Sequence, residues 1–90
     1  MSVNVKLSLL LRKFSGGEEM VEVSGGTPAE CLRDLQDKHP GIEEWLYDKQ
    51  GEVKPQTWLF VNGERIHGDE VGRPLKDGDE LSIMLAIVGG

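Results

Sequence analysis

Hydrophobic residues occupy every second position of residues 3–9, and polar residues stand between them. This period-two pattern predicts a strand with one buried face. Further apolar segments at 20–23, 58–61 and 81–87 predict three more strands, and a shorter segment at 65–67 predicts a brief returning strand. The sequence therefore predicts a sheet of four or five strands.

Paired turn residues separate these segments. Gly16-Gly17 follows the first predicted strand, and Asn62-Gly63 follows the third. Glycine pairs and Asn-Gly favour the tight turns of antiparallel hairpins. We therefore expect a hairpin with a short glycine-containing loop between the first two strands.

The pattern changes to helical spacing after Gly25-Gly26. Thr27 is suited to cap a helix, Pro28 to its first turn, and Glu30 stands at the capping-box position. The predicted helix has about three turns and ends at Pro40-Gly41. Its apolar stripe comprises Cys31, Leu32, Leu35 and His39.

The predicted order is strand, strand, helix, strand, short strand, strand. A mixed sheet that packs one face on a single helix buries these stripes economically. Because the helix provides a crossover, the first and last strands can pair in parallel. We predict an α+β chain with a β-grasp (ubiquitin-like) fold, a mixed four- to five-stranded sheet on one main helix, over residues 1–86, followed by a flexible tail at 87–90.

Composition narrows the function. Ten basic and 16 acidic residues give a formal net charge of −6, which argues against nucleic-acid binding. The acidic charge suits a basic patch on a partner protein, or it serves solubility alone. No apolar run is long enough to span a membrane, and residues 1–6 lack the organisation of a signal peptide. We expect a cytoplasmic protein.

Conventional catalytic motifs are absent from the sequence. There is no phosphate-binding glycine loop, and the carboxylates of Asp69-Glu70 and of residues 77–80 are expected in solvated turns. Two isolated histidines, His39 and His67, and the single Cys31 do not form the pattern of a metal site, so we expect none. Cys31 lies on the helix stripe and is predicted to be a buried core residue. We expect a protein that is not an enzyme and binds no cofactor.

The end of the chain is unusual. Apolar residues run to Val88, and the sequence stops at Gly89-Gly90 with no charged residue after Glu80. Glycine is abundant here, with 12 of 90 residues, so the pair also has a chance explanation. The physical alternative is that residues without Cβ thread a narrow channel and bring the terminal carboxyl close to a partner's catalytic atoms.

Several segments together resemble the ThiS/MoaD family of ubiquitin-like sulfur carriers over nearly the whole chain. They are residues 11–14 before Gly16-Gly17, the Thr27-capped helix, 60–63, 75–83 and 88–90. The stretch from His39 to Pro55 is similar to longer MoaD-type members. Many relatives have proline near the end, where this chain has Leu85-Ala86, which leaves the subfamily open.

The resemblance implies a role for Gly90. An E1-like adenylating enzyme, using its own ATP and Mg²⁺, would join the Gly90 carboxyl to AMP, while Val88 and Gly89 thread the enzyme's channel. A persulfide from a sulfurtransferase would then give a thiocarboxylate, which donates sulfur to a downstream synthase. The product would be a molybdopterin or tungstopterin, thiazole or cysteine-type compound.

Alternation also suggests where partners dock. If Leu59 and Ile83 face the helix, then Trp58, Phe60 and Met84 face away and form an apolar patch. The opposite register would place these three residues in the core. Arg65 is expected either to orient acidic partner groups or to be a solvated surface residue.

Three functional classes remain open on the sequence. The first is a sulfur carrier, which includes the small subunit of molybdopterin synthase. The second is a protein modifier that joins Gly90 to lysines of its targets. The third is an interaction module that makes no use of the terminal carboxyl.

Overall fold

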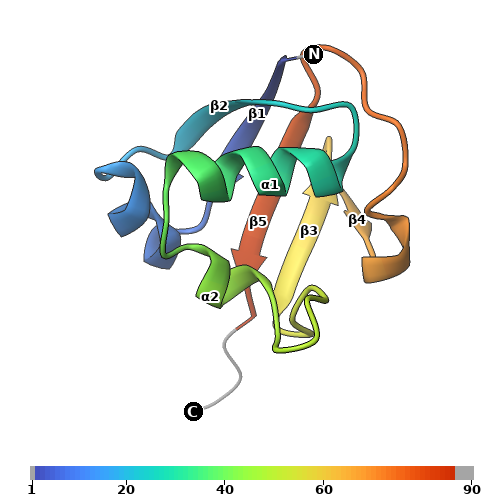
Figure 1. The fold of residues 1–90 in the computed structure, drawn as a ribbon. Coiled ribbons are helices and arrows are strands. Elements are labelled where there is room, and N and C mark those ends of the chain that lie inside the picture. The colour runs from blue at the N-terminus through green and yellow to red at the C-terminus, as the bar shows by residue number, and fades with distance from the viewer. Residues whose placement is uncertain (1, 87–90) are drawn as a thin grey trace.

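The computed structural model describes residues 2–86, whose strands form one mixed sheet (Figure 1). The order across the sheet is β2-β1-β5-β3-β4. β1 and β5 pair in parallel, and the other neighbours are antiparallel. The predicted β-grasp fold, with its central parallel pair, is confirmed. The strands are β1 (Ser2–Leu7), β2 (Met20–Ser24), β3 (Thr57–Val61), β4 (Glu64–Ile66) and β5 (Glu80–Leu85).

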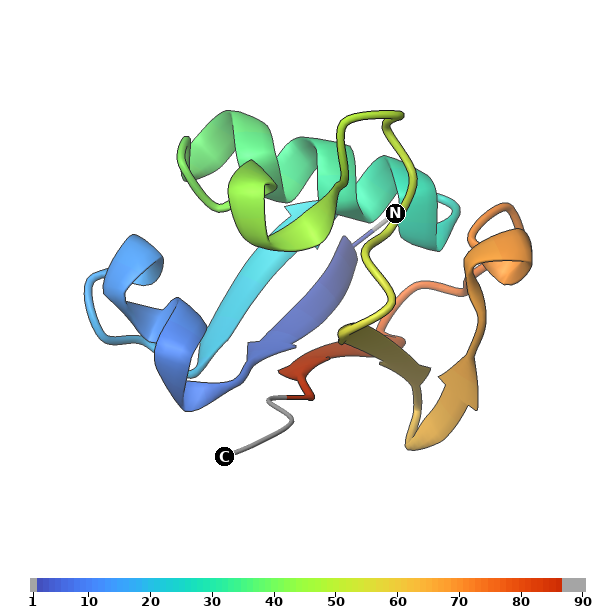
Figure 2. The same cartoon turned by 90° about the horizontal axis from the view of Figure 1, so that it is seen from below.

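Helices α1 (Pro28–Lys38) and α2 (Glu43–Leu46) lie over the same face of the sheet (Figure 2). Thr27 caps α1 as expected, because its Oγ1 accepts a hydrogen bond from the Glu30 N–H at 3.2 Å. The Glu30 carboxylate reaches back to the N–H of Gly26, at 2.7 Å, rather than to that of Thr27. The bond to Thr27 thus satisfies one free amide at the start of the helix, and the Ala29 N–H donates to the Val71 carbonyl at 2.9 Å.

The first connection differs from the short hairpin loop that the sequence predicts. β1 ends at Leu7, and the chain continues as a 3-10 helix, η1 (Leu9–Ser15). The Ser8 N–H still bonds to Ile83, but the Leu11 N–H then bonds back to Ser8 and turns the chain. Leu11 becomes buried, and Leu9, which the alternation placed on the buried face, is 75% exposed.

The boundaries of two strands near the end of the chain also differ from the predicted ones. β4 covers Glu64–Ile66 rather than 65–67, and β5 covers Glu80–Leu85 rather than 81–87. Residue 87 lies outside the described residues. A short 3-10 helix, η2 (Gly68–Glu70), forms where the sequence predicts only turns, and the Glu70 carboxylate accepts a hydrogen bond from the His67 N–H at 3.0 Å.

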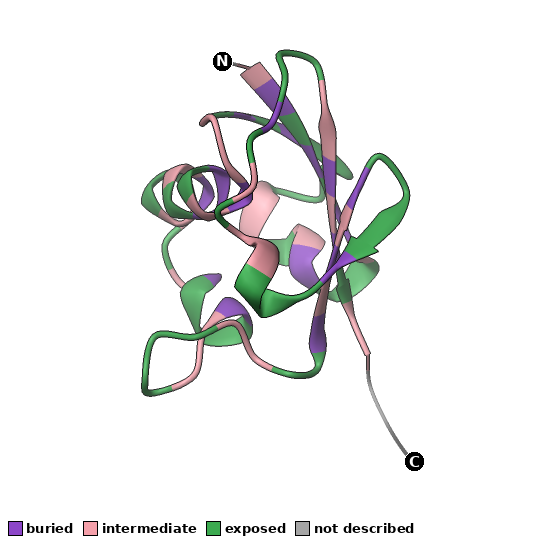
Figure 3. Cartoon of the chain, turned by 90° about the vertical axis from the view of Figure 1, so that its right-hand side faces the viewer, coloured by how far each residue is buried: buried purple, intermediate pink, exposed green. Residues whose placement is uncertain are grey.

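The core lies between the sheet and the two α-helices, where buried residues of both layers meet (Figure 3). Leu32 and Leu35 of α1 and Leu46 of α2 pack on the inward side chains of the strands. None of the helices in the described part of the chain has the length and apolar character needed to cross a membrane.

Candidate functional site

The outer face of the sheet, away from α1 and α2, carries large apolar side chains on β3 and β5. The inward positions of these strands, Leu59 and Ile83 among them, are buried. Trp58 and Phe60 alternate with them and are half-buried, and Met84 is 51% exposed. The opposite register, which would bury all three, is excluded. Their role in docking stays a prediction.

The three residues form one contiguous group, which we call the apolar patch (Trp58, Phe60 and Met84). Trp58 is directly opposite Met84 in the β3–β5 ladder, and Phe60 is next along β3 on the same face. On its other side, Phe60 is opposite Arg65 of β4. The Arg65 guanidinium stacks on the Trp58 ring, with its carbon 3.7 Å from the ring centroid. This stack could not be predicted from the sequence, because it joins neighbouring strands diagonally.

The apolar patch lies at the end of the sheet where the tail begins. Met84 is the penultimate residue of β5, and the Ala86 N–H donates to the Gln56 carbonyl at 2.7 Å. Ala86 is the last described residue. The predicted sulfur-carrying Gly90 and the predicted channel-threading residues Val88 and Gly89 therefore lie outside the described residues.

The turn residues that resemble the family motif lie at the other end of β5. The Asp79 carboxylate accepts hydrogen bonds from the Lys76 N–H, at 2.8 Å, and from the Asn62 side-chain amide, at 3.0 Å. These two bonds, the first foremost, lower the pKa of Asp79. Asp77 accepts from the Ser2 N–H at 2.8 Å. Both carboxylates lie at an exposed turn, as expected, and they also tie it to β1 and to the turn after β3.

Cys31 is fully buried in the core, as predicted. Burial, followed by the nearby charges of Glu30 and Asp34, raises the pKa of the thiol to about 11. A Cβ placed on Gly25 would stand 2.9 Å from the Cys31 sulfur, so the backbone packs closely on it. A thiol in this state is largely protonated at neutral pH and is a poor nucleophile.

The family resemblance implies sulfur loading at Gly90, and on that basis we expect Cys31→Ala to be loaded as fully as the wild type. The substitution removes the thiol from a site that partners do not reach, at a cost in stability of about 1 kcal/mol from the lost packing. Intact-protein mass after sulfur loading is the measurement, and Cys31→Ser serves as a second variant. A folded Cys31→Ala chain that fails to load would contradict the core assignment.

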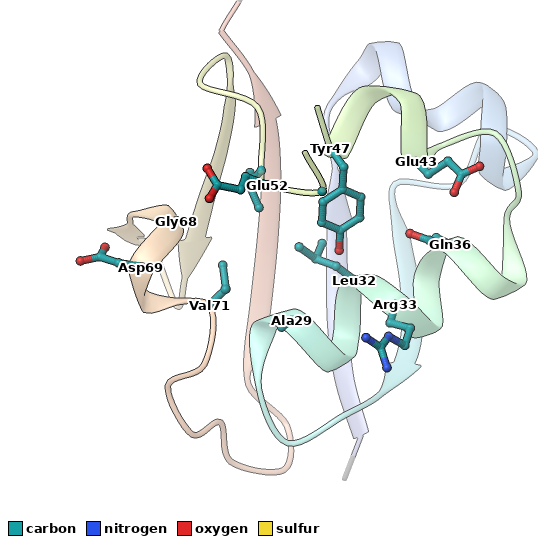
Figure 4. Close-up of a pocket in the computed structure, with 12 residues that line it drawn as sticks. Ala29, Leu32, Arg33, Gln36, Glu43, Tyr47, Glu52, Gly68, Asp69 and Val71 are labelled. Atoms are coloured by element: carbon teal, nitrogen blue, oxygen red, sulfur yellow. The ribbon is translucent and has the colours of Figure 1, made fainter. Parts of the chain in front are cut away.

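An open groove of about 790 Å³ lies on the helix side of the molecule, between α1, α2 and η2 (Figure 4). Tyr47 projects toward Leu32 in it, whereas the Asp69 carboxylate points away. The groove was not foreseen from the sequence, because its walls come from four separate segments. Its polar groups do not converge on one point, and no group of three potential metal-ligating side chains occurs within residues 2–86. We assign it no chemistry.

Comparison with known proteins settles the family. The sequence model of the ThiS family matches residues 5–90. The chain belongs to the ThiS family. The sulfur carrier protein CysO of Mycobacterium tuberculosis is 31% identical over 93 residues that span all of both chains. Small archaeal modifier protein 3 of Haloferax volcanii is 35% identical over 65 residues, which are 71% of this chain and 70% of that one.

Solved structures agree with this assignment to the ThiS family. The Amycolatopsis orientalis BexX/CysO complex contains a chain with a TM-score of 0.85 and 33% identity, which matches 98% of this chain and 99% of that chain. SAMP1 of H. volcanii gives a TM-score of 0.87 at 27% identity, with full coverage of both chains. The resemblance to ubiquitin-like carriers seen in the sequence is thus confirmed, and relatives include both a named sulfur carrier and named modifiers.

Proposed function

We propose that this protein is a sulfur carrier whose Gly90 carboxyl is adenylated by an E1-like enzyme and converted to a thiocarboxylate. The supporting observation is that the family match runs through residue 90, and the alignment with CysO spans both chains completely. The terminal Gly89-Gly90 therefore lies within the matched region.

The proposed chemistry begins with an unreactive carboxylate. A Gly90 oxygen attacks the α-phosphorus of the enzyme's Mg²⁺-bound ATP, pyrophosphate leaves, and an acyl-adenylate forms. The outer sulfur of a sulfurtransferase persulfide then attacks the carbonyl carbon and expels AMP. A second thiol attacks the inner sulfur of the resulting acyl disulfide, which releases the Gly90 thiocarboxylate and leaves a disulfide between the two thiols.

The folded body positions this carboxyl. In the proposal, the apolar patch docks on the activating enzyme while Val88 and Gly89 pass through a narrow channel to its ATP site. Met84 is only six residues before Gly90. Docking close to the start of the tail therefore restricts the positions that the Gly90 carboxyl can reach. This restriction favours a reaction that depends on proximity. The thiocarboxylate would then be delivered to a downstream synthase.

Two alternatives have specific support. Similarity to SAMP1 and to small archaeal modifier protein 3 favours conjugation of Gly90 to lysines of target proteins. A molybdopterin-converting factor complex of Helicobacter pylori contains a similar chain, with a TM-score of 0.66 and 26% identity, which favours a synthase subunit. Both alternatives share the activated terminal carboxyl with the sulfur-carrier proposal.

Mass spectrometry of the protein from its native host tests the proposal. Exchange of one carboxyl oxygen for sulfur adds about 16 Da to the chain. We expect this increase to map to the peptide that ends at Gly90. Lysines of other proteins joined to Gly90 would favour the modifier instead, provided the free chain lacks the mass increase. After trypsin they carry residues 77–90 as the branched remnant, because Lys76 is the last cleavage site. A native chain that continues past Gly90 in its mature form would refute both.

A further inference from the structure

On the outer face of the sheet, cationic and acidic side chains lie in two separate rows that cross the strands. One row across it, nearer the tail, runs through Lys6, Ser82, Phe60 and Arg65, which are paired in register. The row farther from the tail is polar and acidic. It contains Glu22, Asn4, Glu80 and Asn62. The row that includes Phe60 thus carries two cationic side chains and no acidic one, although the chain as a whole has a net charge of −6.

The two cations of the nearer row are held differently. Lys6 lies 3.9 Å from Glu19, a carboxylate that Arg12 approaches to 3.3 Å, so its charge is partly balanced. Arg65 has no carboxylate within ion-pair distance among residues 2–86. Its sequence neighbour Glu64 is opposite Val61, an inward position, and so belongs to the other side of β4.

Stacking prepares Arg65 for binding. Its guanidinium carbon lies 3.7 Å from the centroid of the Trp58 ring, and this contact limits the rotamers of the arginine side chain. A guanidinium held in this way loses less entropy when it binds a planar carboxylate through two parallel hydrogen bonds. The exposed Met84 and the half-buried Phe60 supply apolar contact area beside it.

We infer that this part of the sheet binds an acidic and apolar surface of the activating enzyme, and that Arg65, held against Trp58, selects this surface by binding a carboxylate. The inference rests on the proposed function, because the activating enzyme is its partner. It reverses the expectation from net charge, which suited a basic patch. Charge complementarity at the docking surface is local, since salt screens charges more than about 8 Å apart in physiological solution.

Two charge-reversal variants distinguish the effect of charge at the docking surface from the effect of the chain's net charge. Arg65→Glu and Arg33→Glu each change the net charge from −6 to −8, but Arg33 is exposed on α1, on the opposite side of the molecule. The assay is pyrophosphate exchange by the host's E1-like enzyme, with the carrier chain varied. We expect Arg65→Glu to raise KM about 100-fold, the size of a hot-spot effect, with kcat within about twofold.

The control and a conservative variant complete the test. Arg33→Glu is expected to leave KM within about twofold of the wild type, and Arg65→Lys to raise it about fivefold by losing the planar fork. Unchanged melting curves establish that the variants fold, and Arg65→Gln replaces Arg65→Glu if that variant does not. An unchanged or lowered KM for Arg65→Glu, or an equal rise for Arg33→Glu, would overturn the inference. A wild-type chain that supports no exchange would instead refute the proposed function.

Discussion

Deletion of Gly90 is expected to reduce ATP-dependent adenylation at least about 100-fold, because a displacement of about 1 Å of the reacting atom already has effects of this size. The shortened chain still ends in a carboxyl, but that carboxyl stands one residue short of the α-phosphorus, and the docked body fixes the other end of the tail. Pyrophosphate exchange with the host's E1-like enzyme measures the loss.

Two controls isolate the position of the carboxyl. One alanine added after Gly90 is expected to reduce exchange to a similar extent, because it moves the carboxyl too far and introduces a Cβ into the narrow channel. One alanine placed before Met1 changes the length equally and is expected to have no effect. Melting temperatures should be equal in all three variants, since the core consists of residues within 3–83. Normal exchange by the shortened chain would count against the sulfur carrier and the modifier alike.

Much of the fold could be predicted because its signals are local and mutually consistent. The cap residues Thr27 and Pro28 fix where α1 begins, and the Asn62-Gly63 pair fixes the turn between β3 and β4, where both residues have positive φ. The parallel pairing of β1 with β5 follows once a helix provides the crossover. These features require only short-range patterns and a rule of handedness.

The errors arise where core packing and side-chain hydrogen bonds decide the local structure. Leu9 fits the alternation of a strand, yet the buried Leu11 and the Arg12 side chain, whose Nε donates to the Leu7 carbonyl at 3.1 Å, draw the chain into η1. Likewise, the roles of Asp77 and Asp79 depend on Ser2 and Asn62, which adjoin them only in the folded sheet. The sequence around a carboxylate in a glycine-rich turn does not indicate which group will donate a hydrogen bond to it.

The candidate site likewise has features that the sequence predicts and features that it does not. Alternation along β3 predicted which faces Trp58 and Phe60 present, because the side-chain period of a strand is two. The Arg65–Trp58 stack and the opposite charge of the two rows depend on strand register, which the sequence does not specify. The carboxyl of Gly90 was recognised from composition and family resemblance alone, and its position relative to the apolar patch stays a prediction.

The apolar patch itself is tested by Phe60→Asp, which is expected to raise KM for the carrier in pyrophosphate exchange about 100-fold and leave the fold intact. Phe60 faces outward beside Ser82, so an aspartate there remains hydrated, whereas the activating enzyme would have to bury it against apolar groups. Leu59→Asp is the matched contrast. It introduces the same group one residue away, at a buried position, and is expected to unfold the domain.

A second substitution is needed because Asp at position 60 would stand directly opposite Arg65 and neutralise it. Phe60→Ala removes the ring without adding charge, and we expect a KM increase of about 20-fold from the lost contact area, with kcat unchanged. A small effect of Phe60→Ala beside a large effect of Phe60→Asp would assign the binding energy to Arg65 rather than to the aromatic ring. A large loss of thermal stability in Phe60→Ala would instead place Phe60 among the residues that hold the sheet together and remove it from the docking surface.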